Sequence, residues 1–330
     1  MKTLADAAKE FGLTKATISR ALSGKGRVGK ETREKILEWA AQNNYTPNSI
    51  AKSLAERKTH NIAVVLPKNA DNIFFQQCLV GIAETIVKEG YDTITAIDYG
   101  EDISSIERIV KNQKVDGIIL TRTVENDKIL EYLKNKEIPY LVIGSVKDEG
   151  IYQVDVNHRL AACDLTRQIL HSGTEKIALL AGGRRYPVNR ERVRGFEDAY
   201  KKEGLSLENA KVFWDVWTDS DKYAEKILME LAESDVQCIA STDIAINRHI
   251  LNVLRGKKVR FKKRPRLISF YEGKDDMSFS EDEYPVSTVC IDTFELSHSA
   301  AENMLLILNG KEIPYKTIVP YTLKIRKRGE

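Results

Sequence analysis

Two short amphipathic segments, separated by a turn that contains glycine, open the chain and constrain its fold more than any other feature. Their helical spacing predicts two helices, with Thr3 and Thr14 as N-caps and Gly12 in the left-handed position that ends the first. A third helical segment, about 30–44, follows Gly29, which is an acceptable cap. Two short helices with a third packed beneath them describe a helix-turn-helix, which places its second helix in the major groove of DNA.

The apolar residues of these segments define the faces that we expect to be buried. In the first helix they are Leu4, Ala7, Ala8 and Phe11. In the second helix they are Ile18 and Leu22. The third helix has Trp39 at the edge of an apolar side that consists of Ile36, Leu37, Ala40 and Ala41. The outward side and the start of the second helix then hold Lys15, Ala16, Thr17, Ser19 and Arg20.

These outward residues suit contacts with DNA. Recognition helices use their N-terminal residues for base edges, and Arg20 can make the bidentate contact to guanine that is the commonest specific pairing. The hydroxyls of Thr14, Thr17 and Ser19 suit phosphate oxygens, which fix the register without reading the sequence. The alternative is an ordinary helical hairpin whose charges are solvated.

Charge is distributed unevenly along the chain. Residues 1–60 contain twelve Lys and Arg against six Asp and Glu, which gives a net charge of +6. The whole chain carries +3, so that residues 61–330 carry −3. A basic head on a mildly acidic body is the distribution that neutralisation of phosphates requires, and it favours DNA binding over the solvated hairpin.

Residues 47–60 form the expected hinge or linker between head and body. Pro47 ends the third helix, and Asn48 can cap a short helix over about 49–58. That helix has few apolar residues to bury, and isolated helices this short are marginal in water. We therefore expect a linker that is helical only when something holds it; the plainer interpretation is a linker helix with no further role.

The head and linker together closely resemble the LacI/GalR family of transcriptional repressors. The resemblance is carried by the runs Thr3-Leu4-x-Asp6-Ala7-Ala8, Gly12-Leu13-Thr14-x-x-Thr17-Ile18-Ser19-Arg20, Thr32-Arg33-Glu34-Lys35-Ile36 and Asn44-Tyr45-x-Pro47-Asn48-x-Ile50-Ala51-x-x-Leu54. It covers the whole chain and is densest in the head, residues 1–46. It implies a homodimer whose two heads bind the half-sites of a pseudo-palindromic, double-stranded operator.

The resemblance also implies which residues contact the operator. Lys15 and Ala16 match the variable pair that reads bases together with Arg20, so the operator sequence does not carry over. Contacts with phosphates fall to Thr3, Thr14, Thr17, Ser19, Thr32, Tyr45 and Asn48. In the family the hinge helices of two subunits pair in the minor groove, where Leu54 matches the apolar wedge and Ala51 allows close approach.

The body, residues 61–330, alternates short apolar runs with helical stretches, which predicts parallel sheets with right-handed crossovers. Strands are expected near 62–66, 92–97, 117–120, 139–143, 176–181, 211–216, 237–241, 266–270, 287–291 and 318–326. We expect an all-α head followed by an α/β body of two doubly wound parallel-sheet lobes, similar to periplasmic sugar-binding proteins. Lobe 1 is expected to comprise about 61–157 and 293–320, and lobe 2 about 158–291 and the chain end.

A small-molecule effector is expected between the lobes, because ligands of open α/β sheets lie beyond the carboxyl ends of the strands. Arg192-x-x-Gly195-Phe196 resembles the family's motif, in which the arginine forks onto ligand hydroxyls or a carboxylate. Trp217 falls where the family places an aromatic ring over the ligand. Further candidates after the first strand are Asp71, Phe74 and Phe75. The plainer interpretations are that these phenylalanines pack the start of a helix, and that Trp214 belongs to the core.

One position departs from the family pattern. After the strand 266–270 the family commonly has Tyr-Asp, whose carboxylate holds ligand hydroxyls, whereas this chain has Tyr271 and then Glu272. Tyr271 stays a candidate effector residue, because a phenol can stack or donate one hydrogen bond, but it is not a fixed double acceptor. Glu272 is the available substitute. Asp243 starts a helix at another strand end and either caps that helix, the favoured role, or reaches the ligand. The favoured effector is a sugar or oligosaccharide, ahead of a nucleoside or purine and of a protein coeffector.

Other classes find little support. The alternative to a regulator is a solute-binding module, or an enzyme acting on a sugar or nucleoside. The chain has no Walker loop, dinucleotide fingerprint or nucleophile elbow, which argues against the enzyme. Its four cysteines and five histidines lack metal-ligand spacing, so we expect reduced thiols, no metal, no cofactor and no catalytic residues. No signal peptide or membrane-spanning run is recognisable, which favours a cytoplasmic, nucleoid-associated protein. The chain stops just beyond the last strand, which favours a dimer without a tetramer-forming tail.

Overall fold

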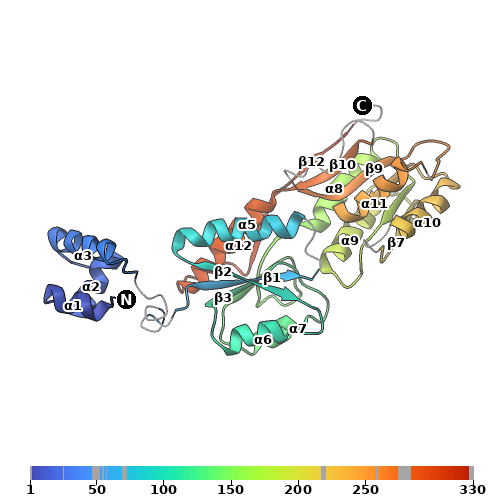
Figure 1. Cartoon of the computed structure of the whole chain (residues 1–330). Coiled ribbons are helices and arrows are strands. Elements are labelled where there is room, and N and C mark those ends of the chain that lie inside the picture. Colours follow the sequence, from blue (N-terminus) through green and yellow to red (C-terminus); the bar gives the residue numbers. More distant parts are fainter. Residues whose placement is uncertain are drawn as a thin grey trace. The chain divides into compact units, whose positions relative to one another are not determined.

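The chain divides into two units, a head, Met1–His60, and a body, Asn61–Glu330 (Figure 1). The computed structural model describes residues 2–24, 26–46, 53, 56, 58–68, 73–216, 221–257, 259–273 and 284–326.

The head is a helix-turn-helix with a third helix packed against it. Its helices are α1 (Leu4–Phe11), α2 (Lys15–Ser23) and α3 (Lys30–Gln42). As predicted, Thr3 caps α1: its hydroxyl accepts from the Asp6 N–H at 3.3 Å, and the Asp6 carboxylate accepts from the Thr3 N–H at 2.8 Å. Thr14 caps α2 by accepting from the Thr17 N–H at 3.1 Å, and Gly12 is left-handed with φ 64°. Both helix ends that form the turn are therefore fixed by local hydrogen bonds.

The core of the head differs from the prediction on α3. Ile18 and Ile36 are fully buried as expected, but Leu37 is 46 % exposed and Trp39 only 5 % exposed. Successive residues of an α-helix point about 100° apart, so Ile36 and Leu37 cannot both face α1 and α2. The indole of Trp39 fills the remaining space and donates its N–H to Glu10 at 2.7 Å.

Lobe 1 of the body is a parallel sheet with the strand order β11-β5-β4-β3-β1-β2. Its strands are β1 (Asn61–Pro67), β2 (Asp92–Asp98), β3 (Gly117–Leu120), β4 (Tyr140–Ile143), β5 (Tyr152–Val156) and β11 (Lys316–Val319). Helices α5 (Ile73–Ile86) and α12 (Thr293–Leu308) cover one face, and α6 (Ser104–Lys111) and α7 (Lys128–Lys134) cover the other (Figure 1). Along β1, Ile62 and Val64 face the first pair and Ala63 and Val65 the second, so this strand is apolar throughout.

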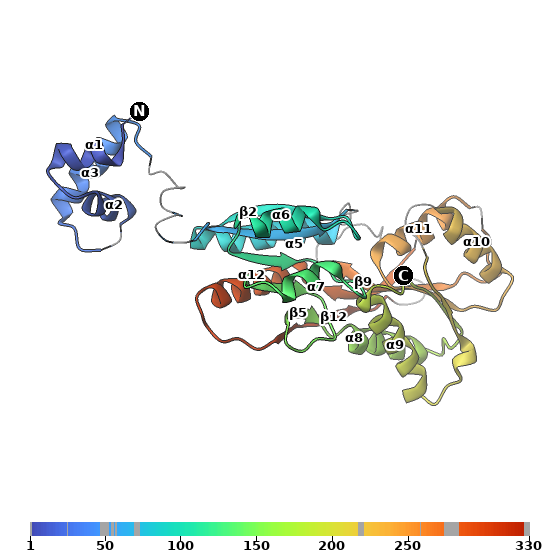
Figure 2. The ribbon, with the colours of Figure 1, turned by 90° about the horizontal axis from the view of Figure 1, so that it is seen from below.

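Lobe 2 repeats this plan with the strand order β12-β10-β9-β8-β6-β7. Its strands are β6 (Ile177–Leu180), β7 (Ala210–Phe213), β8 (Cys238–Ser241), β9 (Arg266–Gly273), β10 (Val286–Ile291) and β12 (Tyr321–Lys324). Figure 2 shows α8 (His158–Leu170) beside α9 (Pro187–Lys202), and α10 (Asp221–Ala232) near α11 (Ile244–Arg255) on the other face. The predicted architecture of a helical head and two doubly wound lobes is confirmed, with β12 as the antiparallel exception.

Three strand predictions were wrong or incomplete. β5 was not predicted, because its run carries Gln153 and Asp155, which are polar yet buried. The single strand expected at 318–326 is two strands in different sheets, β11 and β12, separated by Pro320. The strand expected at 211–216 ends earlier, with β7 at Phe213.

The chain passes between the lobes after β5, after β10 and after β11. At the second of these crossings Asp292 caps α12, its carboxylate accepting from the Glu295 N–H at 3.1 Å. The crossings join the two sheets at the strands β5, β10, β11 and β12.

Candidate functional site

The solvent-facing side of α2 carries the predicted base-reading residues. Lys15, Ala16 and Arg20 are exposed, because Ile18 and Ala21 turn the opposite side of the helix into the head core. The aliphatic part of Arg20 lies beside Gly26, where a Cβ would stand 3.3 Å from Arg20 Cδ. The guanidinium is thus presented on a helix whose start and buried face are both fixed.

Six of the seven predicted phosphate-contacting residues lie in the described part of the head. Ser19 is exposed, Thr32 is half-buried, and the half-buried Tyr45 ring packs 5.7 Å from the Trp39 ring. The hydroxyls of Thr14 and Thr17 lie 2.9 Å apart, and that of Thr3 donates to Asp6 at 2.8 Å, so these three also hold the helix ends. Asn48, Ala51 and Leu54 lie outside the described residues, and their assignments remain predictions.

In the body, Arg192 projects from α9 into the interlobe region. Its side chain is buried, and Nη1 donates to the carbonyl oxygen of Thr242 at 2.7 Å. The guanidinium lies 5.5 Å from the centre of the Tyr271 ring, and its buried Nε has no hydrogen-bond partner among the described residues. Burial lowers the pKa of Arg192, against the opposing attraction of Asp243. A buried, partly unsatisfied guanidinium is a donor ready for a ligand oxygen.

Arg192 is tied to lobe 1 through His158 and Asp155. Arg192 Nη2 lies 3.4 Å from His158 Nδ1, and His158 Nε2 lies 3.2 Å from Asp155 Oδ1. Because arginine only donates, Nδ1 is the acceptor and Nε2 carries the proton. Burial, followed by the charge of Arg192, lowers the pKa of His158. Burial opposes ionisation of Asp155, but the hydrogen bond from His158 and a hydrogen bond from Ser145 at 2.5 Å leave its pKa lowered.

The remaining predicted effector residues fall into three groups. Phe74 and Tyr271 meet edge to face across the lobes, with ring centres 5.7 Å apart, and Phe75 packs beside Phe74 at 5.2 Å. Asp243 caps α11 by accepting from the Ile246 N–H at 3.0 Å, which is the role favoured for it. Asp71 and Trp217 lie outside the described residues.

Two residues weighed as alternatives have partners of their own. Glu272 is buried and accepts a hydrogen bond from the Thr288 hydroxyl at 2.5 Å, within lobe 2. Its role as a substitute carboxylate stays a prediction, and one of its oxygens already has this partner on β10. Trp214 packs against the core as expected and carries the Arg184 guanidinium over its ring at 4.8 Å.

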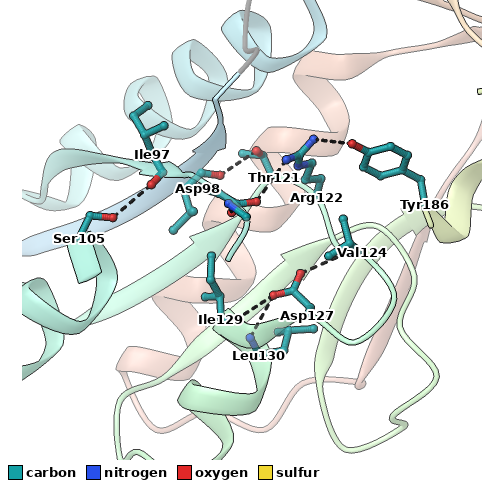
Figure 3. A network of polar contacts seen from close by, with 12 residues as sticks. Ile97, Asp98, Ser105, Thr121, Arg122, Val124, Asp127, Ile129, Leu130 and Tyr186 are labelled. Carbon is teal, nitrogen blue, oxygen red and sulfur yellow. Dashed lines mark hydrogen bonds and ion pairs between the residues drawn. The ribbon is translucent and has the colours of Figure 1, made fainter. Parts of the chain in front are cut away.

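A polar network at the end of β3 also reaches across the lobes (Figure 3). Arg122 donates from Nη2 to Asp98 at 3.3 Å and from Nη1 to the Tyr186 hydroxyl of lobe 2 at 3.2 Å. Asp127 holds the following loop by accepting from the Val124 N–H at 3.2 Å while it caps α7. Burial raises the pKa of Asp127 against the hydrogen bonds that it accepts.

Sequence reasoning missed Asp155, His158 and Arg122. Their partners are 24 to 64 residues away or lie on a strand that was not recognised. One sequence signal could have identified Arg122 and its partner Asp98 as site candidates. Both are polar residues at or just beyond the carboxyl end of a parallel strand, where ligands of such sheets bind.

The described part of the chain shows neither a cluster of metal ligands nor a membrane-spanning helix. No three His, Cys, Asp or Glu side chains there are grouped as metal ligands would be. No helix there is long and apolar enough to cross a membrane.

Two family models match this chain. The first, periplasmic binding proteins and sugar binding domain of LacI family, matches residues 59–252, and the second, bacterial regulatory proteins of the lacI family, matches residues 3–48. The chain belongs to the LacI family. The helix-turn-helix head thus matches the regulatory-protein model, and the greater part of the two-lobed body matches the sugar-binding model.

LacI-family regulators of known name resemble the chain along almost its full length. The HTH-type transcriptional regulator MalR of Streptococcus pneumoniae serotype 4 is 24% identical over 332 residues, which cover 97% of this chain and 98% of that protein. Catabolite control protein A of Priestia megaterium is 27% identical over 333 residues, 98% of each chain. One relative is thus named as a transcriptional regulator and the other as a catabolite control protein.

Solved structures agree on the fold. The Lac repressor dimer bound to operator and the anti-inducer ONPF has a TM-score of 0.82 at 20% identity, covering 99% of this chain and 98% of that one. A complex of the transcriptional regulator CelR with cellobiose has a TM-score of 0.71 at 23% identity and covers all of both chains.

Proposed function

We propose that this LacI-family regulator is a transcriptional repressor whose two subunits read the half-sites of a pseudo-palindromic operator. The observation that carries the proposal is the exposed row Lys15, Ala16 and Arg20 on a helix fixed at its start by Thr14, in a head of net charge +6. Arg20 reads a guanine, and the surrounding hydroxyls and Tyr45 position the head on phosphates. In the hinge, Leu54 acts as the minor-groove wedge beside Ala51 and Asn48.

The effector of this repressor is a small carbohydrate bound between the lobes. Arg192 supplies a buried donor to ligand oxygens, while Phe74 and Tyr271 supply aromatic surface, with Phe75, Asp71, Trp217 and Asp243 as further neighbours. The CelR regulator was solved with cellobiose, and its fold matches this chain, which supports a sugar as the ligand class. Binding changes the angle between the lobes and thereby the pairing of the hinge helices.

Selection of binding sites from a random DNA library tests the repressor proposal. We expect the full chain to enrich a pseudo-palindrome with one guanine per half-site that depends on Arg20. Arg20→Ala should cost about 1–3 kcal/mol in affinity for that site, because the bidentate contact is lost, while binding to unrelated DNA falls far less.

The matched control is Lys35→Ala, which removes one positive charge from α3, where Lys35 pairs with Glu31. This variant should retain the preference for the selected site. Equal losses on selected and unrelated DNA in Arg20→Ala would reduce Arg20 to a phosphate contact, and a failure to enrich any palindrome would overturn the proposal.

A further inference from the structure

The three chain crossings lie at one side of the interlobe region. In lobe 1 the strands that lead into crossings, β5 and β11, stand at one end of the sheet, and β1 and β2 stand at the other. In lobe 2 the strands β10 and β12 stand at the crossing end, and β6 and β7 at the other. When two lobes rotate about their crossings, the atoms farthest from the crossings move farthest apart. Contacts on the remote side are therefore the first to break.

Three hydrogen bonds join the lobes away from the crossings. Arg122 Nη1 donates to the Tyr186 hydroxyl at 3.2 Å, the Glu125 N–H donates to the Arg185 carbonyl oxygen at 2.8 Å, and Arg190 Nη1 donates to Glu125 Oε2 at 3.2 Å. The lobe 1 residues follow β3, and the lobe 2 residues follow β6. We call these five residues the clasp.

Both halves of the clasp are held by rigid elements. On lobe 1, Asp98 at the end of β2 anchors Arg122 at 3.3 Å, and Asp127 fixes the loop to the start of α7 (Figure 3). On lobe 2, Tyr186 is the N-cap residue of α9, the helix that also carries Arg192. The Arg122 guanidinium additionally lies 5.3 Å from the centre of the Tyr186 ring. Closing the clasp therefore fixes the start of the helix that presents the proposed effector-binding arginine.

We propose that the clasp holds the two lobes closed at a distance from the crossings, and that its residues set how fast the effector is released. Arg122, Glu125, Tyr186 and Arg190 are positioning residues, because they act through the angle between the lobes. The effector part rests on the proposed function, whereas the closure itself does not.

The Glu125 amide reports the clasp directly, because its hydrogen bond crosses from one lobe to the other. Hydrogen exchange of the full chain, resolved to this amide, measures how often the bond opens. The Thr121 N–H, bonded to the Val65 carbonyl oxygen at 3.1 Å inside lobe 1, is the internal reference. We expect Arg190→Glu to speed exchange at Glu125 about tenfold, since a charge-assisted bond is replaced by repulsion, and to leave Thr121 unchanged.

Charge reversal and a neighbouring arginine provide the controls. The double variant Glu125→Arg with Arg190→Glu should restore slow exchange at position 125, and Tyr186→Phe should have a smaller effect than Arg190→Glu. Arg184→Ala should have none, because Arg184 stacks on Trp214 within lobe 2. Unchanged exchange at Glu125 in Arg190→Glu, or equal acceleration at Thr121, would overturn the clasp.

Release of maltose and cellobiose, followed by stopped flow, tests the link to the effector. Faster release of a bound disaccharide from Arg190→Glu is expected, with recovery in the double variant. Release of a disaccharide at the same rate from the wild type and from Arg190→Glu would overturn control of release by the clasp. If neither disaccharide binds the wild type while the exchange result holds, the clasp stands and the proposed ligand class fails.

Discussion

Arg192 and His158 show how single residues build a charged site inside an apolar body. The guanidinium keeps its charge in a buried position because a carbonyl oxygen, an imidazole nitrogen and an aromatic ring surround it. His158 stays neutral, since burial and Arg192 both lower its pKa. The charge of Arg192 is attracted most strongly by Asp243, and also by Asp155 on the other lobe. The three side chains thus form one continuous polar connection next to a chain crossing.

The lowered pKa of His158 predicts how stability depends on pH. Below pH 6.5, the ordinary pKa of histidine, the unfolded chain takes up a proton that folded His158 does not, so the free energy of unfolding falls as the pH falls. This stability is present above the ordinary pKa and is lost as the pH falls through the lower, folded pKa. Urea denaturation between pH 5 and 8 should give His158→Gln a flatter profile than the wild type. The difference in slope should reach at most about 1.4 kcal/mol per pH unit. Parallel profiles would contradict the lowered pKa, because they would mean that His158 takes up its proton over the same pH range in the folded and the unfolded chain.

At the scale of elements, α8 and α9 pack so closely at Gly195 that any side chain at this position would clash with α8. A Cβ at Gly195 would stand 2.1 Å from the carbonyl oxygen of Arg159 and 3.0 Å from Ala162 Cβ. The glycine of the Arg-x-x-Gly-Phe motif therefore serves the contact between two helices, and it sets the position of Arg192 one turn earlier. The same device recurs where α5 crosses α12, since a Cβ at Gly81 would stand 2.1 Å from Ser297 Oγ.

These two glycines predict different responses to alanine. Gly195→Ala should lower the free energy of unfolding by about 1–3 kcal/mol, because the main chain of α8 must move. Gly81→Ala should also destabilise, but Ser297→Ala should relieve it by removing the obstructing hydroxyl. Urea unfolding of the single and double variants measures both effects. An unchanged free energy of unfolding in Gly195→Ala would contradict this, because it would mean that α8 can move away from α9 without loss of stability.

Elements with local signals could be predicted from the sequence, and those defined by distant partners could not. The caps Thr3, Thr14 and Asp243 were predicted because a cap bonds to the helix that follows it. β5 escaped because its buried Gln153 and Asp155 are satisfied by residues that only the fold brings near, such as Val146 and Ser145. Arg122 was not predicted for the same reason, because its partners Asp98 and Tyr186 are distant in the sequence.

On the scale of the whole molecule, the proposed function requires the head and the body to be coupled. The head offers a helix whose exposed side carries Lys15 and Arg20, and the body offers two lobes joined by three crossings and by the clasp. A ligand can shift this system only by binding one lobe arrangement more tightly than another. In regulators such coupling typically amounts to about 1–3 kcal/mol, or a 5- to 150-fold change in affinity.

The most direct test of this account is the affinity for the selected operator with and without a saccharide. Maltose, cellobiose and longer oligosaccharides would first be screened by thermal melting, where a ligand at a hundred times its Kd adds about 2.7 kcal/mol to stability. Fluorescence anisotropy would then compare the wild type with Arg192→Ala and with the milder Arg192→Lys. The account predicts that the stabilising saccharide shifts operator affinity at least fivefold in the wild type and leaves it unchanged in Arg192→Ala, which still binds the operator. The same shift in both proteins, or none in the wild type, would contradict it.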